Sequence, residues 1–202
     1  MEEILQDVRG AFPYQDGIIV YGRSVAEHDK CLFEVLQKLQ EKGVTLNRKK
    51  CVFGVDEIEF LGYRISAEGI RPDPGKVEAL KQMSPPTDVA GVRRFLGMAQ
   101  QMSKFIPNYG EIVVPISELL KKKNDFVWLT EQQEGFEAEK AAMTSETCLA
   151  HYDPQLKTRV VADASSFAVG SVISQQQLDG DWKPVAYASR TMSETERHYV
   201  QI

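Results

Sequence analysis

Residues 159–176 read RVVADASSFAVGSVISQQ, and their short runs of β-branched and small residues predict β-strands. The following stretch, LDGDWKPVAYASR at residues 178–190, continues the pattern, and its Asp-Gly pair is typical of a hairpin turn. Asp163 comes after an apolar run, and a carboxylate at the end of a strand can face a metal ion. The last quarter of the chain is therefore predicted to be rich in strands, with Asp163 as a candidate ligand.

The N-terminal part predicts a second hairpin, followed by a helix. Residues 13–21 read PYQDGIIVY, and Asp16-Gly17 favours a turn in which Gly17 adopts a positive φ. A short helix is expected before this hairpin, over residues 1–8. Ser24 and Glu27 then form a capping box, and Gly43 is a plausible stop for the helix. The expected buried face of this helix is Val25, Leu32, Val35, Leu36 and Leu39.

Strands and helices alternate through the middle of the chain. Residues 49–73 contain short β-rich runs interrupted by glycines, which predicts an antiparallel strand meander. Residues 72–124 predict only helices, one of them capped by Thr87 with a buried stripe at Val89, Val92, Phe95, Leu96, Ala99 and Met102. Thr130 and Gln133 predict a further capping box. SETE at 193–196 begins one more helix that Ile202 cuts short, so we expect a truncated domain.

Composition restricts the class of protein. The chain has 202 residues and a formal net charge of −5, and no apolar run approaches the roughly 20 residues of a membrane helix. The N-terminus lacks the basic and apolar regions of a signal peptide. Three widely spaced cysteines predict reduced thiols in an intracellular protein, cytoplasmic or nuclear and not secreted. His28, His151 and His198 have no spacing typical of zinc or of a catalytic triad.

The positive charge is concentrated in the middle of the chain. From Pro72 to Lys123 there are eight lysines and arginines against five acidic residues. Such a segment can contact phosphates, although a solvated helix face is the simpler interpretation. The candidate nucleic-acid-binding residues are Arg93, Arg94, Lys104, Lys121, Lys122 and Lys123.

Four stretches in this order resemble one family. They are FGVDEIEFLGYRISAEGI, VRRFLGMAQ followed by FIPNY, FVWLTEQQEGFEAEK, and VVADASSFAVGSVISQ followed by KPVAYASRTMSETERHY. Together they resemble the reverse transcriptase and ribonuclease H (RNase H) region of gypsy-class LTR retrotransposons, which are relatives of the retroviral enzymes. The resemblance implies a mixed α/β (α+β) chain in four parts: the C-terminal part of the polymerase palm (1–71), a helical thumb (72–124), a connection (125–155) and the first strands of an RNase H-like mixed sheet (156–202).

The resemblance also implies where chemistry would occur. Asp16 matches the first of two aspartates at the tip of the palm hairpin, and Gly17 stands where the second is expected. Asp163 matches the first of four acidic RNase H ligands. Both would hold Mg²⁺, but two-metal phosphoryl transfer needs several converging carboxylates. Glu194 and Glu196 are more simply cap and dipole partners.

Three hypotheses about function follow. The chain is a fragment of an RNA-directed DNA polymerase with RNase H, catalytically incomplete on its own. Alternatively, it is a non-catalytic module that binds an RNA–DNA hybrid or a DNA duplex, or it is an inactive transposon remnant. The expected partners are such duplexes and the remaining parts of a parent polyprotein, with no membrane. Salt-dependent duplex binding without turnover would favour the binding module.

Overall fold

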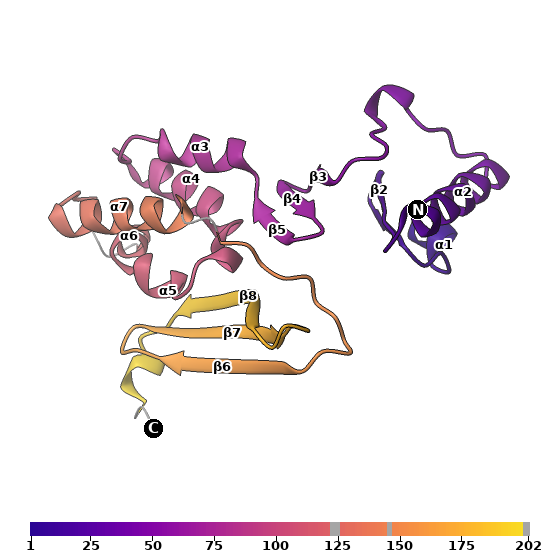
Figure 1. Cartoon of the computed structure of the whole chain (residues 1–202). Coiled ribbons are helices and arrows are strands. Elements are labelled where there is room, and N and C mark those ends of the chain that lie inside the picture. The colour runs from indigo at the N-terminus through magenta and orange to yellow at the C-terminus, as the bar shows by residue number, and fades with distance from the viewer. Residues whose placement is uncertain (122–125, 145–146, 200–202) are drawn as a thin grey trace. The chain divides into compact units, whose positions relative to one another are not determined.

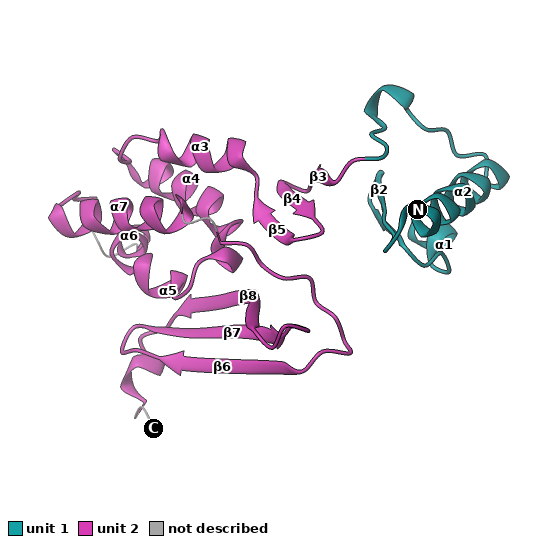
Figure 2. Ribbon diagram, in the orientation of Figure 1, with its two compact units in different colours: residues 1–54 teal, residues 55–202 magenta. Residues whose placement is uncertain are grey.

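The computed structural model describes residues 1–121, 126–144 and 147–199. The chain folds into two compact units, residues 1–54 and residues 55–202, which Figure 2 shows in different colours. Both units mix helices with antiparallel strands (Figure 1), so the predicted mixed fold class is confirmed. None of the helices in these described stretches is long and apolar enough to cross a membrane.

The first unit packs a long helix against a hairpin. Its elements are α1 (Glu2–Leu5), β1 (Ala11–Tyr14), β2 (Gly17–Val20), α2 (Val25–Glu41) and the 3₁₀ turn η1 (Arg48–Lys50). The predicted helix boundaries are confirmed, because the Ser24 side chain accepts a hydrogen bond from the Glu27 N–H, and Gly43 has a φ of 67° just after the helix.

The buried face of α2 is narrower than predicted. Cys31, Val35 and Leu39, spaced four residues apart, are buried together with Leu5 and Val8. Val25 is 78% exposed and Leu36 is also exposed, so both are wrong as core predictions. Val25 is the first residue of the helix, and Leu36 follows Val35 by one residue, a step that turns a side chain about 100° away from the buried stripe.

The second unit begins with the predicted meander. Strands β3 (Glu57–Phe60), β4 (Tyr63–Ser66) and β5 (Gly69–Pro72) form an antiparallel sheet in that order. Helices α3 (Pro74–Lys81) and α4 (Val89–Gln100) follow. The predicted cap of α4 was wrong by one residue: Asp88, not Thr87, accepts the Gly91 N–H at 2.6 Å.

Short helical turns complete a helical layer. They are η2 (Ser103–Phe105), α5 (Tyr109–Ile112), α6 (Val114–Ser117), η3 (Glu118–Leu120) and the longer α7 (Thr130–Thr144). The core of this layer includes four residues of the predicted stripe: Val92, Phe95 and Ala99 of α4, and Met102, which follows that helix. At the start of α7 the hydrogen bonds differ from the predicted Thr130–Gln133 box. The Gln132 side chain accepts the Leu129 N–H, while Gln133 accepts the Trp128 indole N–H.

A second three-stranded antiparallel sheet packs against this layer. Its strands are β6 (Thr158–Ala164), β7 (Ala168–Gln176) and β8 (Trp182–Thr191), in that order. Helix α5 lies against β7 and β8 (Figure 1), so the helical layer covers one face of this sheet. The helix predicted to begin at residues 193–196 is a 3₁₀ turn, η4 (Glu196–His198), in the part of the C-terminus that the structure describes.

The buried side chain of Gln175 holds the segment that leads into strand β6. Its side-chain oxygen accepts the Asp153 N–H at 2.9 Å, and its amide donates to the Asp153 carbonyl at 2.7 Å and to Thr158 Oγ1 at 2.9 Å. A fully buried amide is tolerated because each of its polar atoms is paired in this way. Nearby, Leu149 pairs with Ile70 of β5, while the Ala150 N–H donates to the Pro184 carbonyl in β8. The segment therefore links the two sheets of this unit.

Candidate metal ligands and nucleic-acid-binding residues

Asp16 lies in the two-residue turn between β1 and β2. Tyr14 pairs with Gly17, which leaves Gln15 and Asp16 as the turn residues. The residue with a positive φ is Gln15, at 52°, and Gly17 is the first residue of β2. The expectation that Gly17 relieves a strained turn is therefore wrong, because the strained position lies two residues earlier.

The surroundings of Asp16 do not form a metal centre. Its side chain is exposed at the tip of the hairpin, with Gly17 beside it. Among the described residues, no group of three or more histidine, cysteine, aspartate or glutamate side chains could hold an ion. A pair of Mg²⁺ ions requires several carboxylates and near-octahedral oxygen ligands. The residues present around Asp16 do not meet that requirement.

Asp163 lies near the end of the edge strand β6. Its Oδ1 accepts the N–H of Ala164 at 2.9 Å, and the residue pairs with Gly170 of β7. A depression of about 40 Å³ lies beside it and is also lined by Asn108 and Glu111 of the helical layer. Asp163 and Glu111 thus bring two carboxylates to one depression, which is short of the set that a two-metal site needs.

Glu196 has a structural role, as predicted. Its carboxylate forms two bonds with the Arg190 guanidinium, at 2.7 and 2.8 Å, and accepts the Ser193 N–H. These bonds, chiefly the one to Arg190, lower the pKa of Glu196 to about 2. Both oxygens of this carboxylate are bonded, to Arg190 and to Ser193. Glu196 is therefore not available as a second metal ligand beside Asp163.

The predicted nucleic-acid-binding residues fall in different environments. Arg93 and Arg94 are exposed on α4, and neither forms an ion pair with a residue that the structure describes. Lys121 forms an ion pair with Glu118 at 2.7 Å. Lys122 and Lys123 lie outside the described residues.

Lys104 differs from the other candidates because it is half-buried. Its Nζ lies 3.5 Å from the centre of the Tyr63 ring, a cation–π contact, and burial lowers its pKa. The Tyr63 hydroxyl in turn donates to the Gln101 carbonyl. Lys104 therefore joins strand β4 to η2, and its charge is less accessible to phosphates than that of Arg93 or Arg94.

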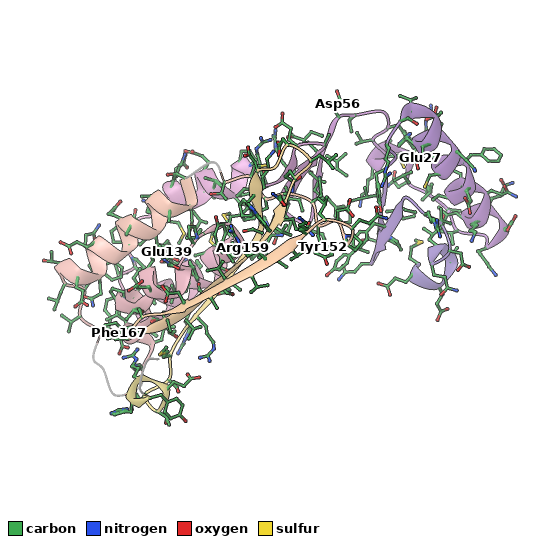
Figure 3. The ribbon with its side chains drawn as sticks, turned by 60° about the horizontal axis from the view of Figure 1, so that its bottom comes forward. Glu27, Asp56, Glu139, Tyr152, Arg159 and Phe167 are labelled. Atoms are coloured by element: carbon green, nitrogen blue, oxygen red, sulfur yellow. The ribbon has the colours of Figure 1, made fainter. Side chains whose placement is uncertain are left out.

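Two features of this region were not anticipated from the sequence. Glu139 of α7 is fully buried in the helical layer, where Figure 3 labels it, and neither of its carboxylate oxygens has a well-formed hydrogen bond among the described residues. Burial raises the pKa of Glu139 to about 7, and the nearby Tyr109 hydroxyl opposes this shift only in part. Asn108 and Glu111 were likewise not expected beside Asp163, since they precede it by 55 and 52 residues and nothing in local sequence predicts so distant a contact.

Two family models match the chain. Residues 1–65 match reverse transcriptase (RNA-dependent DNA polymerase), and residues 128–202 match the RNase H-like domain found in reverse transcriptase. The Tf2-7 and Tf2-3 transposon polyproteins of Schizosaccharomyces pombe are each 34% identical over 186 residues. These alignments cover 92% of this chain and 14% of each relative, so the chain spans about one seventh of these polyproteins.

Solved structures of a viral protein are similar to nearly the whole chain. A dRH form of the foamy viral protease-reverse transcriptase, in complex with double-stranded DNA, matches with a TM-score of 0.86 and 25% identity. The match covers 98% of this chain and 35% of the viral one. The same viral protein in complex with an RNA/DNA hybrid matches with a TM-score of 0.84 and 26% identity, over 98% of this chain and 27% of that one.

Proposed function

Because this chain belongs to the reverse transcriptase and RNase H region of LTR retrotransposon polyproteins, we propose that its 202 residues bind a nucleic-acid duplex without catalysing a reaction on it. The proposed ligand is an RNA–DNA hybrid or a DNA duplex. The proposed parts are those implied by the family resemblance: palm (1–71), thumb (72–124), connection (125–155) and RNase H-like strands (156–202).

The observation that carries the proposal is the likeness to the foamy viral protein. It extends over 98% of this chain, and the similar structures hold double-stranded DNA or an RNA/DNA hybrid. Duplex affinity comes mainly from cations that neutralise phosphates. The exposed side chains of Arg93 and Arg94, on one helix and without ion-pair partners among the described residues, are the proposed phosphate contacts.

The acidic residues support the proposal that the chain does not catalyse a reaction on the duplex. Polymerisation and RNA cleavage in this family use divalent metal ions, with Mg²⁺ as the expected ion. Asp16 stands beside Gly17, and among the acidic residues that the structure describes Asp163 shares its depression only with Glu111. These sets do not fit a pair of ions, so the proposed function of this chain alone includes no catalytic step. Catalysis would need carboxylates from other parts of a polyprotein, which are the proposed protein partners.

The three cysteines are free thiols in the structure, one of them buried. This supports a reducing compartment, the cytoplasm or the nucleus, as the place where the protein acts.

A charge-reversal experiment tests the binding half of the proposal. The variant Arg93→Glu/Arg94→Glu should bind a labelled RNA–DNA hybrid at least tenfold more weakly and reduce the slope of log affinity against log salt by about two, one for each lost phosphate contact. The control Lys30→Glu/Lys42→Glu makes the same change of net charge on α2 and its C-terminal cap. Equal losses in both variants would reject the assignment of the arginines.

A further inference from the structure

The segment Asn108–Glu111 is docked on the sheet at very short range. The Gly110 N–H donates to Ser189 Oγ at 2.7 Å. A Cβ atom on Gly110 would lie 2.8 Å from the backbone of Arg190, and a Cβ on Gly170 would lie 2.9 Å from Asn108 Oδ1. The two surfaces approach this closely only because both positions are glycine.

The docked face is the one that carries Asp163. Asp163 pairs with Gly170, and Gly170 pairs with Ser189. Directly opposed residues of an antiparallel sheet project from the same face, so these three positions form one row across the sheet. Asn108 and Gly110 contact two members of that row, and Glu111 lines the depression beside the third.

The docked segment leaves no room for a nucleic acid on that face. The depression of about 40 Å³ can hold water but not a nucleotide. Glu111 adds a second negative charge beside Asp163, which disfavours the approach of phosphates. A duplex that contacts Asp163 from this face would have to displace the segment.

We propose that the Asn108–Glu111 segment is an intramolecular lid that closes the Asp163 face of the β6–β8 sheet to nucleic acid. Tyr109 of this segment is buried in the helical core, so the lid opens when the sheet separates from the helical layer. The inference rests on the proposed function, because it assumes that the chain binds a duplex. It adds that the chain has a closed form, in which a duplex can contact the helical layer but not the Asp163 face of the sheet.

Glycine substitutions provide the test in the full chain. Gly170→Val places a branched side chain against Asn108 Oδ1 and should undock the segment. Asn108→Gly removes that amide from the other side and suits its positive φ of 53°, so it opens the lid with little risk to folding. Gly97→Val is the control, since a Cβ at Gly97 on α4 meets open space.

The readout is hydrogen exchange measured by mass spectrometry, with and without a labelled RNA–DNA hybrid. Both opening variants should exchange faster over residues 108–112, and the control should not. The hybrid should then protect residues 159–164 at concentrations at least tenfold lower in the opening variants than in the unmodified chain. Cleavage activity is not needed for this readout.

The outcomes separate the lid from the proposed function. Faster exchange over 108–112 with unchanged hybrid protection of 159–164 would reject the lid and leave duplex binding intact, provided that residues around α4 are still protected. Unchanged exchange over 108–112 in both opening variants would also reject the lid. No protection anywhere in any of the proteins would overturn the proposed function and, with it, the lid.

Discussion

Glu139 is an acidic residue inside an apolar core, in a helix whose neighbouring core positions are Phe136 and Met143. Its pKa is raised from 4.5 to about 7 by burial. Between these values the folded protein holds a proton that the unfolded chain releases, so the free energy of unfolding should fall as pH rises from 4.5 to 7. Above pH 7 the buried, ionised Glu139 should lower the free energy of unfolding by about 3 kcal/mol, at about 1.4 kcal/mol per pKa unit.

We expect Glu139→Leu to stabilise the second unit by about 2–3 kcal/mol at pH 8 and to remove this pH dependence. Urea unfolding followed by tryptophan fluorescence measures it, since Trp128 and Trp182 both lie in this unit. Glu134→Leu on the exposed side of α7 is the matched control and should change stability by less than about 0.5 kcal/mol. A stability that stays flat between pH 4.5 and 7 in the unmodified protein would contradict the assignment.

The turn at Asp16 gives a second prediction at the scale of single residues. Gln15 has a φ of 52°, which suits glycine and strongly disfavours a β-branched side chain. Gln15→Val should therefore destabilise the hairpin by about 1 kcal/mol or more, whereas Gly17→Asp should be nearly neutral. Amide exchange of residues 11–20 measures both. If Gly17→Asp were the more damaging change, Gly17 would have a conformational role that this turn does not show.

Helix caps illustrate how far local sequence predicts an element. The start of α4 was predicted within one residue, and only hydrogen-bond geometry shows that Asp88 rather than Thr87 is the cap. Asp88→Ala should cost about 1 kcal/mol, because the Gly91 N–H loses its acceptor. Thr87→Ala should cost little. Urea unfolding of both variants distinguishes them, and equal effects would contradict the observed cap.

Element type and order could be predicted from the sequence because each element contains its own signal. The Ser24–Glu27 box, the glycines of the meander and the Asp-Gly turn before β8 are all local patterns. The contact of Asn108 with Gly170 is not local, and it depends on how the helical layer packs on the sheet. The burial of Glu139 was missed for a related reason, since an acid in a helix is ordinarily a surface residue.

At the scale of the whole molecule, the family could be recognised from the order of four stretches, and the relatives confirm it. The candidate ligands could be identified from the sequence, but the residues that surround them in the structure could not be predicted. Asp16 lies at an exposed turn, and Asp163 lies beside Glu111 and the docked segment. Fold resemblance to an enzyme does not supply a site, because chemistry depends on which side chains converge.

We expect this chain to bind a nucleic-acid duplex without catalysing a reaction on it. Purified protein would be incubated with a labelled RNA–DNA hybrid and Mg²⁺ at low and high salt, and both the mobility shift and the length of the RNA would be followed. We expect a shift at low salt that is lost at high salt, with the RNA intact throughout. Mg²⁺-dependent RNA cleavage, or no shift at low salt, would contradict the proposal that this chain binds a duplex without catalysis.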